Sequence, residues 1–262
     1  MRPRDEIAAI HQQYWERVAA EEYRPTLDLD PTPLRDYGAG QTEQAPARLV
    51  DEMHPADLLA GIAGKDVLCL AAGGGCQTAF FGLLGARVTS ADLAERELEH
   101  DRAAAAHYGY EVRAIQADMR DLSELEEESF DLVWATSMHC VPDVREVYAQ
   151  VARVLRPHGI YRPDFANPQG EFAHEEWDGV GYRITRPYAE RVRHTPGGAI
   201  EFRHYLRDIF GGLLAAGFSV QRVEEDPGFE KQDPSATPGS YRHSDAYLVG
   251  FVIVARKETG RG

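Results

Sequence analysis

The chain has 262 residues, of which 43% are hydrophobic and 27% charged, so it is long enough for one large domain or one domain with a modest cap. No run of 18 or more apolar residues occurs, which excludes a membrane-spanning helix, and the first 15 residues lack the apolar stretch of a secretory signal. The formal net charge of −15 disfavours nucleic acids and anionic membranes as partners.

The first 60 residues are predicted to form a helical cap. Helical patterns cover residues 5–22 and roughly residues 46–59, without a strand pattern between them. The segment 30–38 carries Pro31 and Pro33, and we interpret it as a proline-rich connector between the two helices.

From residue 61 onward, short apolar runs alternate with helical patterns. Strands are expected at residues 67–72, 87–93, 111–118, 130–136, 159–165, 218–225 and 246–257, and helices at residues 76–84, 95–108, 144–155 and 207–216. Strands that alternate with helices at this spacing form βαβ units with right-handed crossovers. The pattern therefore predicts an α/β fold: a Rossmann-like, seven-stranded, mostly parallel sheet with helices on both faces.

The alternation of strands and helices stops between residues 167 and 205. We interpret this segment as a lid-like insertion in a core of residues 61–262. A strand pair is expected at residues 181–192 and 199–206, with the turn at residues 195–198. An insertion after the fifth strand lies over the carboxyl edge of the sheet, where open α/β folds bind their ligands.

The first strand-to-helix turn contains three consecutive glycines, Gly73, Gly74 and Gly75, in the stretch LCLAAGGGCQ. Glycines at this turn allow the backbone to approach a bound ligand closely. The alternative interpretation is a tight turn with no ligand.

Carboxylates and a polar loop follow the next three strands. Asp92 ends the second strand, where a carboxylate can accept hydrogen bonds from both ribose hydroxyls of an adenosine. Asp118 ends the third strand, where it can accept from the adenine amino group while Met119 lies against the ring. The alternative for both carboxylates is a capping role. The fourth strand leads directly into a polar loop that contains Ser137.

Residues from about 65 to 257 resemble the class I S-adenosylmethionine (SAM)-dependent methyltransferases, especially the small-molecule branch. The motifs are KDVLCLAAGGG, VTSADLA, QADMRDL, FDLVWATSMHCVPD and VARVLRPHGIY, in the order and spacing of that family. The resemblance implies SAM as the cofactor, transfer of its methyl group by a single in-line displacement, and a small-molecule acceptor. It assigns the cofactor site to Gly73, Gly74, Gly75, Asp92, Leu93, Asp118, Met119 and Ser137.

The chain departs from the family pattern at two positions in its first motif. Cys69 stands where an acidic residue is usual, and Ala71 stands where a glycine is usual. The lost acid changes how the methionine end of the cofactor is held, and the alanine narrows the room there.

Two other functions compete with a methyltransferase. A dinucleotide-dependent NAD(P) oxidoreductase would suit Asp92, but Thr78 stands where its fingerprint has a third glycine, and no Tyr-x-x-x-Lys pair follows the fourth strand. A non-catalytic SAM-binding subunit would keep the same fold and motifs.

Two histidines are candidate general bases. His139 follows the fourth strand, near the expected position of the methyl group, and His204 can face the site from the insertion. A packing role is the alternative for each. Cys140 is next to His139, but we do not expect adjacent side chains to face each other.

The segments that cover the site are rich in aromatic residues, and aromatic faces attract a sulfonium cation. We expect Tyr14 and Tyr37 to contact SAM, with the cap's own core as the alternative.

The three cysteines form no CxxC pair, so we expect neither a disulfide framework nor a metal site, and a cytoplasmic location. The motifs of nucleic-acid methyltransferases are absent after the fourth strand, and no cluster of basic residues suits phosphate contacts. The acceptor atom stays open among O, N, C and S, and the oligomeric state is open as well.

Overall fold

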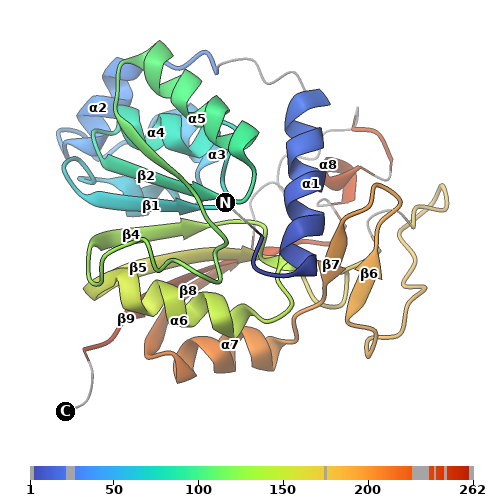
Figure 1. Cartoon of the computed structure of the whole chain (residues 1–262). Helices are drawn as coiled ribbons and strands as arrows, with labels where there is room; N and C mark the ends of the chain where they lie inside the picture. Colours follow the sequence, from blue (N-terminus) through green and yellow to red (C-terminus); the bar gives the residue numbers. More distant parts are fainter. Residues whose placement is uncertain are drawn as a thin grey trace.

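A computed structural model describes residues 3–21, 27–173, 176–225, 236–238, 240–244 and 247–259 of the chain (Figure 1). Its centre is a seven-stranded sheet in the order β3-β2-β1-β4-β5-β9-β8, in which only β9 runs antiparallel to its neighbours. The strands are β1 Asp66–Leu70, β2 Arg87–Asp92, β3 Val112–Gln116, β4 Phe130–Ala135, β5 Leu155–Phe165, β8 Phe218–Glu225 and β9 Phe251–Lys257. The predicted α/β fold is confirmed.

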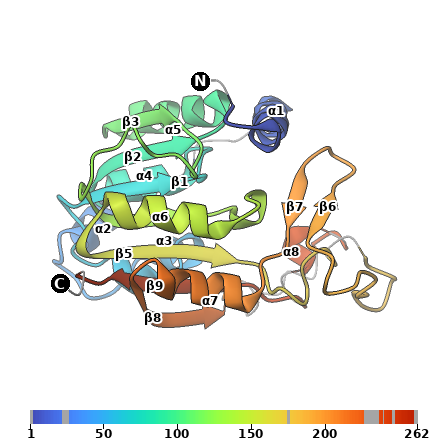
Figure 2. The same ribbon diagram turned by 60° about the horizontal axis from the view of Figure 1, so that its bottom comes forward.

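Helices cover both faces of this sheet (Figure 1). The helices of the repeating units are α4 Cys76–Leu83, α5 Glu95–Tyr108, α6 Val144–Val154 and α7 Leu206–Ala215. Figure 2 shows α6 and α7 on one side of the sheet, and the short helices η2 Met138–Cys140 and α8 Tyr241–Ser244 follow β4 and precede β9. None of the helices in the described residues is long and apolar enough to cross a membrane.

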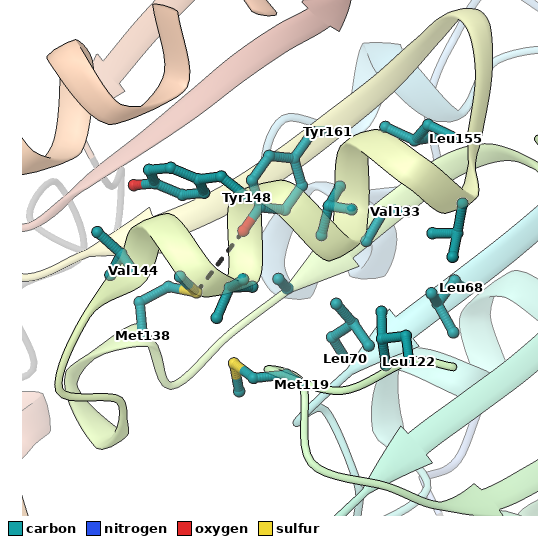
Figure 3. Packing of buried hydrophobic residues seen from close by; sticks show 14 of the residues in the cluster. Leu68, Leu70, Met119, Leu122, Val133, Met138, Val144, Tyr148, Leu155 and Tyr161 are labelled. Atoms are coloured by element: carbon teal, nitrogen blue, oxygen red, sulfur yellow. Dashed lines mark hydrogen bonds between the residues drawn. The ribbon is translucent and has the colours of Figure 1, made fainter. Parts of the chain in front are cut away.

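Alternate residues of the central strands build two separate cores. Leu68, Leu70 and Val133 point toward α6 and α7, where Tyr148 and Tyr161 are fully buried. Val67, Cys69, Leu132 and Trp134 point to the opposite face, among residues of α4 and the N-terminal helices. Figure 3 shows the first core, in which the Tyr161 hydroxyl donates to the sulfur of Met138 at 3.7 Å. This contact fixes the loop after β4 to the body of the protein.

The N-terminal residues divide between two places. Helix α1 (Glu6–Glu21) lies across the carboxyl ends of the strands (Figure 1), whereas α3 (Ala47–Glu52) and the turn η1 (Ala56–Leu59) pack against the sheet face that α4 covers. The predicted connector at residues 30–38 was wrong, because Pro31–Gly38 forms helix α2. Proline is well suited to the first helical position, and the Asp30 side chain caps the helix by accepting from the Thr32 N–H at 2.9 Å.

The insertion contains a smaller strand pair than predicted. Its strands are β6 Val192–His194 and β7 Ile200–Phe202, and the predicted turn at residues 195–198 joins them. Residues 183–191 form no strand, and the prolyl ring at Pro187 removes a donor that a strand ladder needs. The last strand begins at Phe251, and residues 245 and 246 lie outside the described residues.

Candidate active site

A cavity of about 880 Å³, counting the space open to solvent at its mouth, lies at the carboxyl ends of β1, β2, β3 and β4. In the strand order, β1 and β4 are neighbours, so the cavity spans the switch point at which open α/β sheets bind ligands. Its lining combines ends of strands with one face of α1: Ile7, Ala8, His11, Trp15, Ala71, Ala72, Gly73, Gln77, Ala91, Asp92, Leu93, Glu97, Ala117, Asp118, Met119, Arg120, Thr136, Ser137, Cys140 and Val141.

The glycine turn allows two elements to meet behind this cavity. A Cβ atom on Gly73 would lie 2.4 Å from the Cβ of Glu97 and 3.1 Å from Oδ2 of Asp92, so no side chain fits there. Gly74 and Gly75 have φ values of 102° and 81°, a conformation that side chains strain. Of the three predicted glycines, only Gly73 lines the cavity, and the other two shape the turn behind it.

A buried carboxylate holds the turn in place. Asp101 of α5 accepts from the Gly75 N–H and the Thr78 hydroxyl, both at 2.9 Å, and from the Ser90 hydroxyl at 2.6 Å. Burial raises the pKa of Asp101, and these three donors oppose that shift. Asp101 therefore fixes the glycine turn, α4 and β2 to α5. The sequence analysis missed this residue.

Asp92 ends β2 at the wall of the cavity and is only 8% exposed. One oxygen accepts from the Ala94 N–H at 2.9 Å, and the other lies beside Gly73. The alternative of a helix cap is wrong for Asp92, because the N-cap residue of α5 is Ala94, whose side chain makes no capping hydrogen bond. Burial raises the pKa of Asp92 to about 7; the Ala94 N–H opposes the shift, and the charges of Glu97 and Asp101 add to it. The carboxylate is thus poorly solvated and short of donors.

Asp118 lines the cavity after β3, but its carboxylate is already in an ion pair. Arg120 donates to both oxygens, at distances between 2.6 and 3.2 Å, and the same guanidinium donates to Asp5 at 2.9 and 3.1 Å. This buried link joins the start of α1 to the edge of the sheet. The Arg120 backbone N–H donates to Oδ1 as well, at 2.8 Å, so contacts from Arg120 already occupy both oxygens of Asp118.

Helix α1 closes the cavity with residues one turn apart. Ile7, His11 and Trp15 recur at four-residue intervals and therefore share one face, which lines the cavity. The neighbouring face fastens the helix: Gln12 donates to the Leu93 carbonyl at 3.2 Å, and Glu16 accepts from the Glu95 N–H at 2.7 Å. The helix is therefore bound to the end of β2 as well as to Arg120.

The loop after β4 forms the opposite wall. The Thr136 hydroxyl donates to the Ala71 carbonyl at 2.5 Å, which ties the ends of β4 and β1 together. Ala71 has a φ of 49° and Ser137 a φ of 57°. A positive φ explains why the family pattern has glycine at the position of Ala71, and it shows that the alanine is strained there.

Cys140 lies in this loop within hydrogen-bonding range of His139 and of His11 from α1. Our expectation that Cys140 and His139 would not face each other was wrong, because the single turn η2 brings both side chains to the same side. Burial alone would raise the pKa of the Cys140 thiol, but His139 and His11 outweigh it and hold that pKa below its ordinary value. Burial opposes charging of His139, but Cys140, Glu171 and Glu201 raise its pKa above the ordinary value.

Besides Gly74 and Gly75, four predicted site residues do not line the cavity. The His204 ring donates to the Met138 carbonyl at 3.0 Å, and burial lowers its pKa to about 4. His139 lies behind Cys140. Tyr14 packs against Gly197 of the insertion turn, and the Tyr37 hydroxyl donates to the Ala56 carbonyl inside the second core. Tyr37 thus takes the alternative role, part of the core.

Half of the predicted site residues line the cavity. The cavity brings together six predicted residues: Gly73, Asp92, Leu93, Asp118, Met119 and Ser137. Trp15 is one of the aromatic residues in the segments expected to cover the site, although no contact with SAM was predicted for it. His11, Glu97 and Arg120 were not predicted, and the signal for His11 was its spacing with Ile7 and Trp15 on a predicted helix.

Comparisons with known proteins show which proteins the chain is similar to. Residues 68–162 match the model of a methyltransferase domain family. The chain is 34% identical over 233 residues to the uncharacterized methyltransferase YbaJ of Bacillus subtilis, covering 84% of this chain and 83% of that protein. It is 31% identical to the ubiquinone biosynthesis O-methyltransferase of Pseudomonas syringae pv. tomato over 60% of each chain. The structure of a SAM-dependent methyltransferase from Mesorhizobium loti matches 76% of this chain and 94% of its own with a TM-score of 0.63, at 24% identity.

Proposed function

Because the chain belongs to the class I SAM-dependent methyltransferases, we propose that it methylates a hydroxyl oxygen of a small molecule bound in the cavity beneath α1. SAM is its cofactor, and the dinucleotide alternative is therefore set aside. The observation that carries the proposal is that α1 covers the cavity with buried residues such as Ala8 and His11, which leaves an enclosed space of a size that suits a small acceptor.

The residues of the cavity fit SAM. Asp92 is a buried carboxylate whose donors are the backbone N–H groups of Ala94 and Gly73, and its remaining acceptor positions suit two vicinal ribose hydroxyls. Leu93 and Met119 give apolar surface between Asp92 and Asp118, which suits an adenine ring. The turn at Gly73 leaves room for a ligand close to the backbone. We assign the adenosine to the ends of β2 and β3, and the methionine end to Ala71, Gly73 and Ser137.

This assignment places the methyl group toward the loop after β4. When bound, SAM supplies an activated methyl group on a sulfonium. The chain contributes alignment and the exclusion of water: α1 covers the site, and the Thr136 hydrogen bond holds the facing loop in position. The acceptor then lies among Trp15, Val141, Cys140 and His11.

Two features support a small hydroxyl-bearing acceptor. Trp15 and Val141 offer apolar surface for a flat molecule, and the polar side chains of His11 and Cys140 line the same cavity. The relative from Pseudomonas syringae is named as an O-methyltransferase of ubiquinone biosynthesis. The three cysteines are free thiols, which suits the cytoplasmic location that we propose.

The test uses SAM with a radiolabelled methyl group and three kinds of acceptor: small phenols, a protein mixture and total RNA. We expect label in an organic extract of the phenol reactions and none in the polymers. Label confined to protein or RNA would contradict the proposal. Binding of SAM without transfer to any acceptor would favour the non-catalytic subunit instead.

A further inference from the structure

We propose that His11 of α1 is the general base of the reaction and accepts the proton of the acceptor hydroxyl. The inference rests on the proposed O-methylation and adds the residue that carries the proton. It assigns a catalytic role to the helix that closes the site.

The first observation is an unsatisfied histidine. His11 is 1% exposed; the Cys140 thiol lies within range of its ring, but neither ring nitrogen has a hydrogen bond of good geometry among the described residues. A buried polar group without a partner is costly, and the cost is normally met by a functional role or a ligand. The ring lines the cavity, so an acceptor bound there is in position to supply the missing hydrogen bond.

The second observation is the position of the ring. His11 shares its face of α1 with Trp15 and Ile7 and lies near Cys140 of the loop after β4. That loop borders the methionine end of the proposed SAM site. The imidazole is therefore on the side of the cavity to which the methyl group is directed.

The other two histidines near the site are engaged elsewhere. His139 does not line the cavity, and Cys140, Glu171 and Glu201 raise its pKa, which favours the protonated imidazole and makes it a poor proton acceptor. His204 donates from Nε2 to the Met138 carbonyl, and its other ring nitrogen is buried outside the cavity. His11 alone of the three lines the cavity.

The proposed step balances. The acceptor oxygen forms a bond to the methyl carbon as the bond from that carbon to sulfur breaks, and the sulfur keeps the electron pair. The hydroxyl proton passes to a ring nitrogen of His11, which becomes an imidazolium. That charge forms beside Cys140, with Asp92 and Glu97 also on the cavity wall and His139, Glu171 and Glu201 beyond the thiol. The proton then leaves to solvent through the mouth of the cavity.

Because the proposed base is a residue of α1, the proton transfer depends on the position of that helix over the cavity. The helix is fastened by Asp5 to Arg120, by Gln12 to Leu93 and by Glu16 to Glu95. An imidazole on this helix reaches the acceptor only when the helix is seated and water is excluded.

The experiment compares two acceptors, catechol and 4-nitrocatechol, in the wild type and His11→Asn. The nitro group makes the hydroxyl far more acidic, so the second acceptor is largely ionised near neutral pH and needs little help from a base. We expect kcat for catechol to fall about 10²-fold or more. We expect a fall of less than about tenfold for 4-nitrocatechol, and SAM binding within about threefold of the wild type. Raising the pH is expected to restore part of the catechol rate.

Controls separate the possible outcomes. Gln13→Ala changes an exposed residue of the same helix and is expected to behave as the wild type. If His11→Asn folds poorly, His11→Gln takes its place in the comparison. The melting temperature of each variant shows which variants are folded. Equal losses of kcat on both acceptors, or no loss on catechol, would overturn the assignment of His11 as the base but not the proposed function. A wild type that binds SAM but methylates neither phenol would overturn the proposed function, and this inference with it.

Discussion

Replacement of Asp92 by asparagine is expected to separate folding from cofactor binding. The carboxylate has a pKa raised by burial from 3.8 to about 7. A raised acid pKa means that the folded protein holds a proton that the unfolded chain has released. The stability contributed by this group is therefore fully present below pH 3.8 and is lost as the pH rises toward 7. At pH 8 the buried charge costs about 4 kcal/mol, at 1.36 kcal/mol for each pKa unit.

Asparagine has nearly the same shape, keeps an oxygen for the Ala94 N–H and carries no charge. Asp92→Asn is therefore expected to be more stable than the wild type at pH 8, by up to about 4 kcal/mol, with the difference vanishing near pH 4. Cofactor affinity moves the other way. Each hydrogen bond from a ribose hydroxyl to a charged oxygen is worth about 1.5–3 kcal/mol, so the Kd for S-adenosylhomocysteine is expected to rise at least tenfold.

The assays are thermal unfolding between pH 4 and 8 and calorimetric titration with S-adenosylhomocysteine. Glu99→Gln removes an exposed carboxylate from the adjacent helix α5 and is the matched control, with no change expected in either measurement. An unchanged Kd in Asp92→Asn would refute the ribose assignment. A loss of stability at pH 8 would refute the conclusion that burial dominates the charge of Asp92.

Three further predictions concern the walls of the site. Iodoacetamide is expected to modify Cys140 at pH 7 at least tenfold faster than Cys76, because the pKa of Cys140 is lowered and burial raises that of Cys76 to about 11. Bound S-adenosylhomocysteine is expected to slow the modification of Cys140. Equal rates for the two cysteines, measured by mass spectrometry, would contradict the lowered pKa of Cys140. Ala71→Gly is expected to melt no lower than the wild type, since a φ of 49° costs alanine about 1 kcal/mol, whereas Ala71→Val is expected to melt lower; the reverse order in a thermal scan would contradict the strained turn. Asp101→Ala is expected to lower the free energy of unfolding by roughly 2–4 kcal/mol in urea titrations, because it leaves three buried donors unpaired. A loss below about 0.5 kcal/mol would show that the glycine turn does not need Asp101 to keep its conformation.

Much of the sheet could be predicted because parallel strands are buried on both faces and appear as short apolar runs. The buried strand β4 was predicted at residues 130–136 and covers Phe130–Ala135, and Asp92 and Asp118 line the cavity because the carboxyl ends of parallel strands meet at one edge. Helix α2 was missed because prolines at a helix start resemble those of a connector.

The residues that complete the site depend on contacts between distant segments. His11 has no local motif, and its role follows only when α1 docks across the ends of the strands. Asp101 is one acidic residue among several on α5, and only the fold brings it to Gly75. Cys140 meets His139 because one tight turn alters the direction of two adjacent side chains. Such pairings are long-range properties of packing.

A crystal structure of the complex with S-adenosylhomocysteine tests the central claim most directly. We predict that both ribose hydroxyls donate to Asp92, that the adenine lies between Leu93 and Met119, and that the sulfur points toward Cys140 and the ring of His11. A ribose bound away from Asp92, or a sulfur directed away from the loop after β4, would contradict the account.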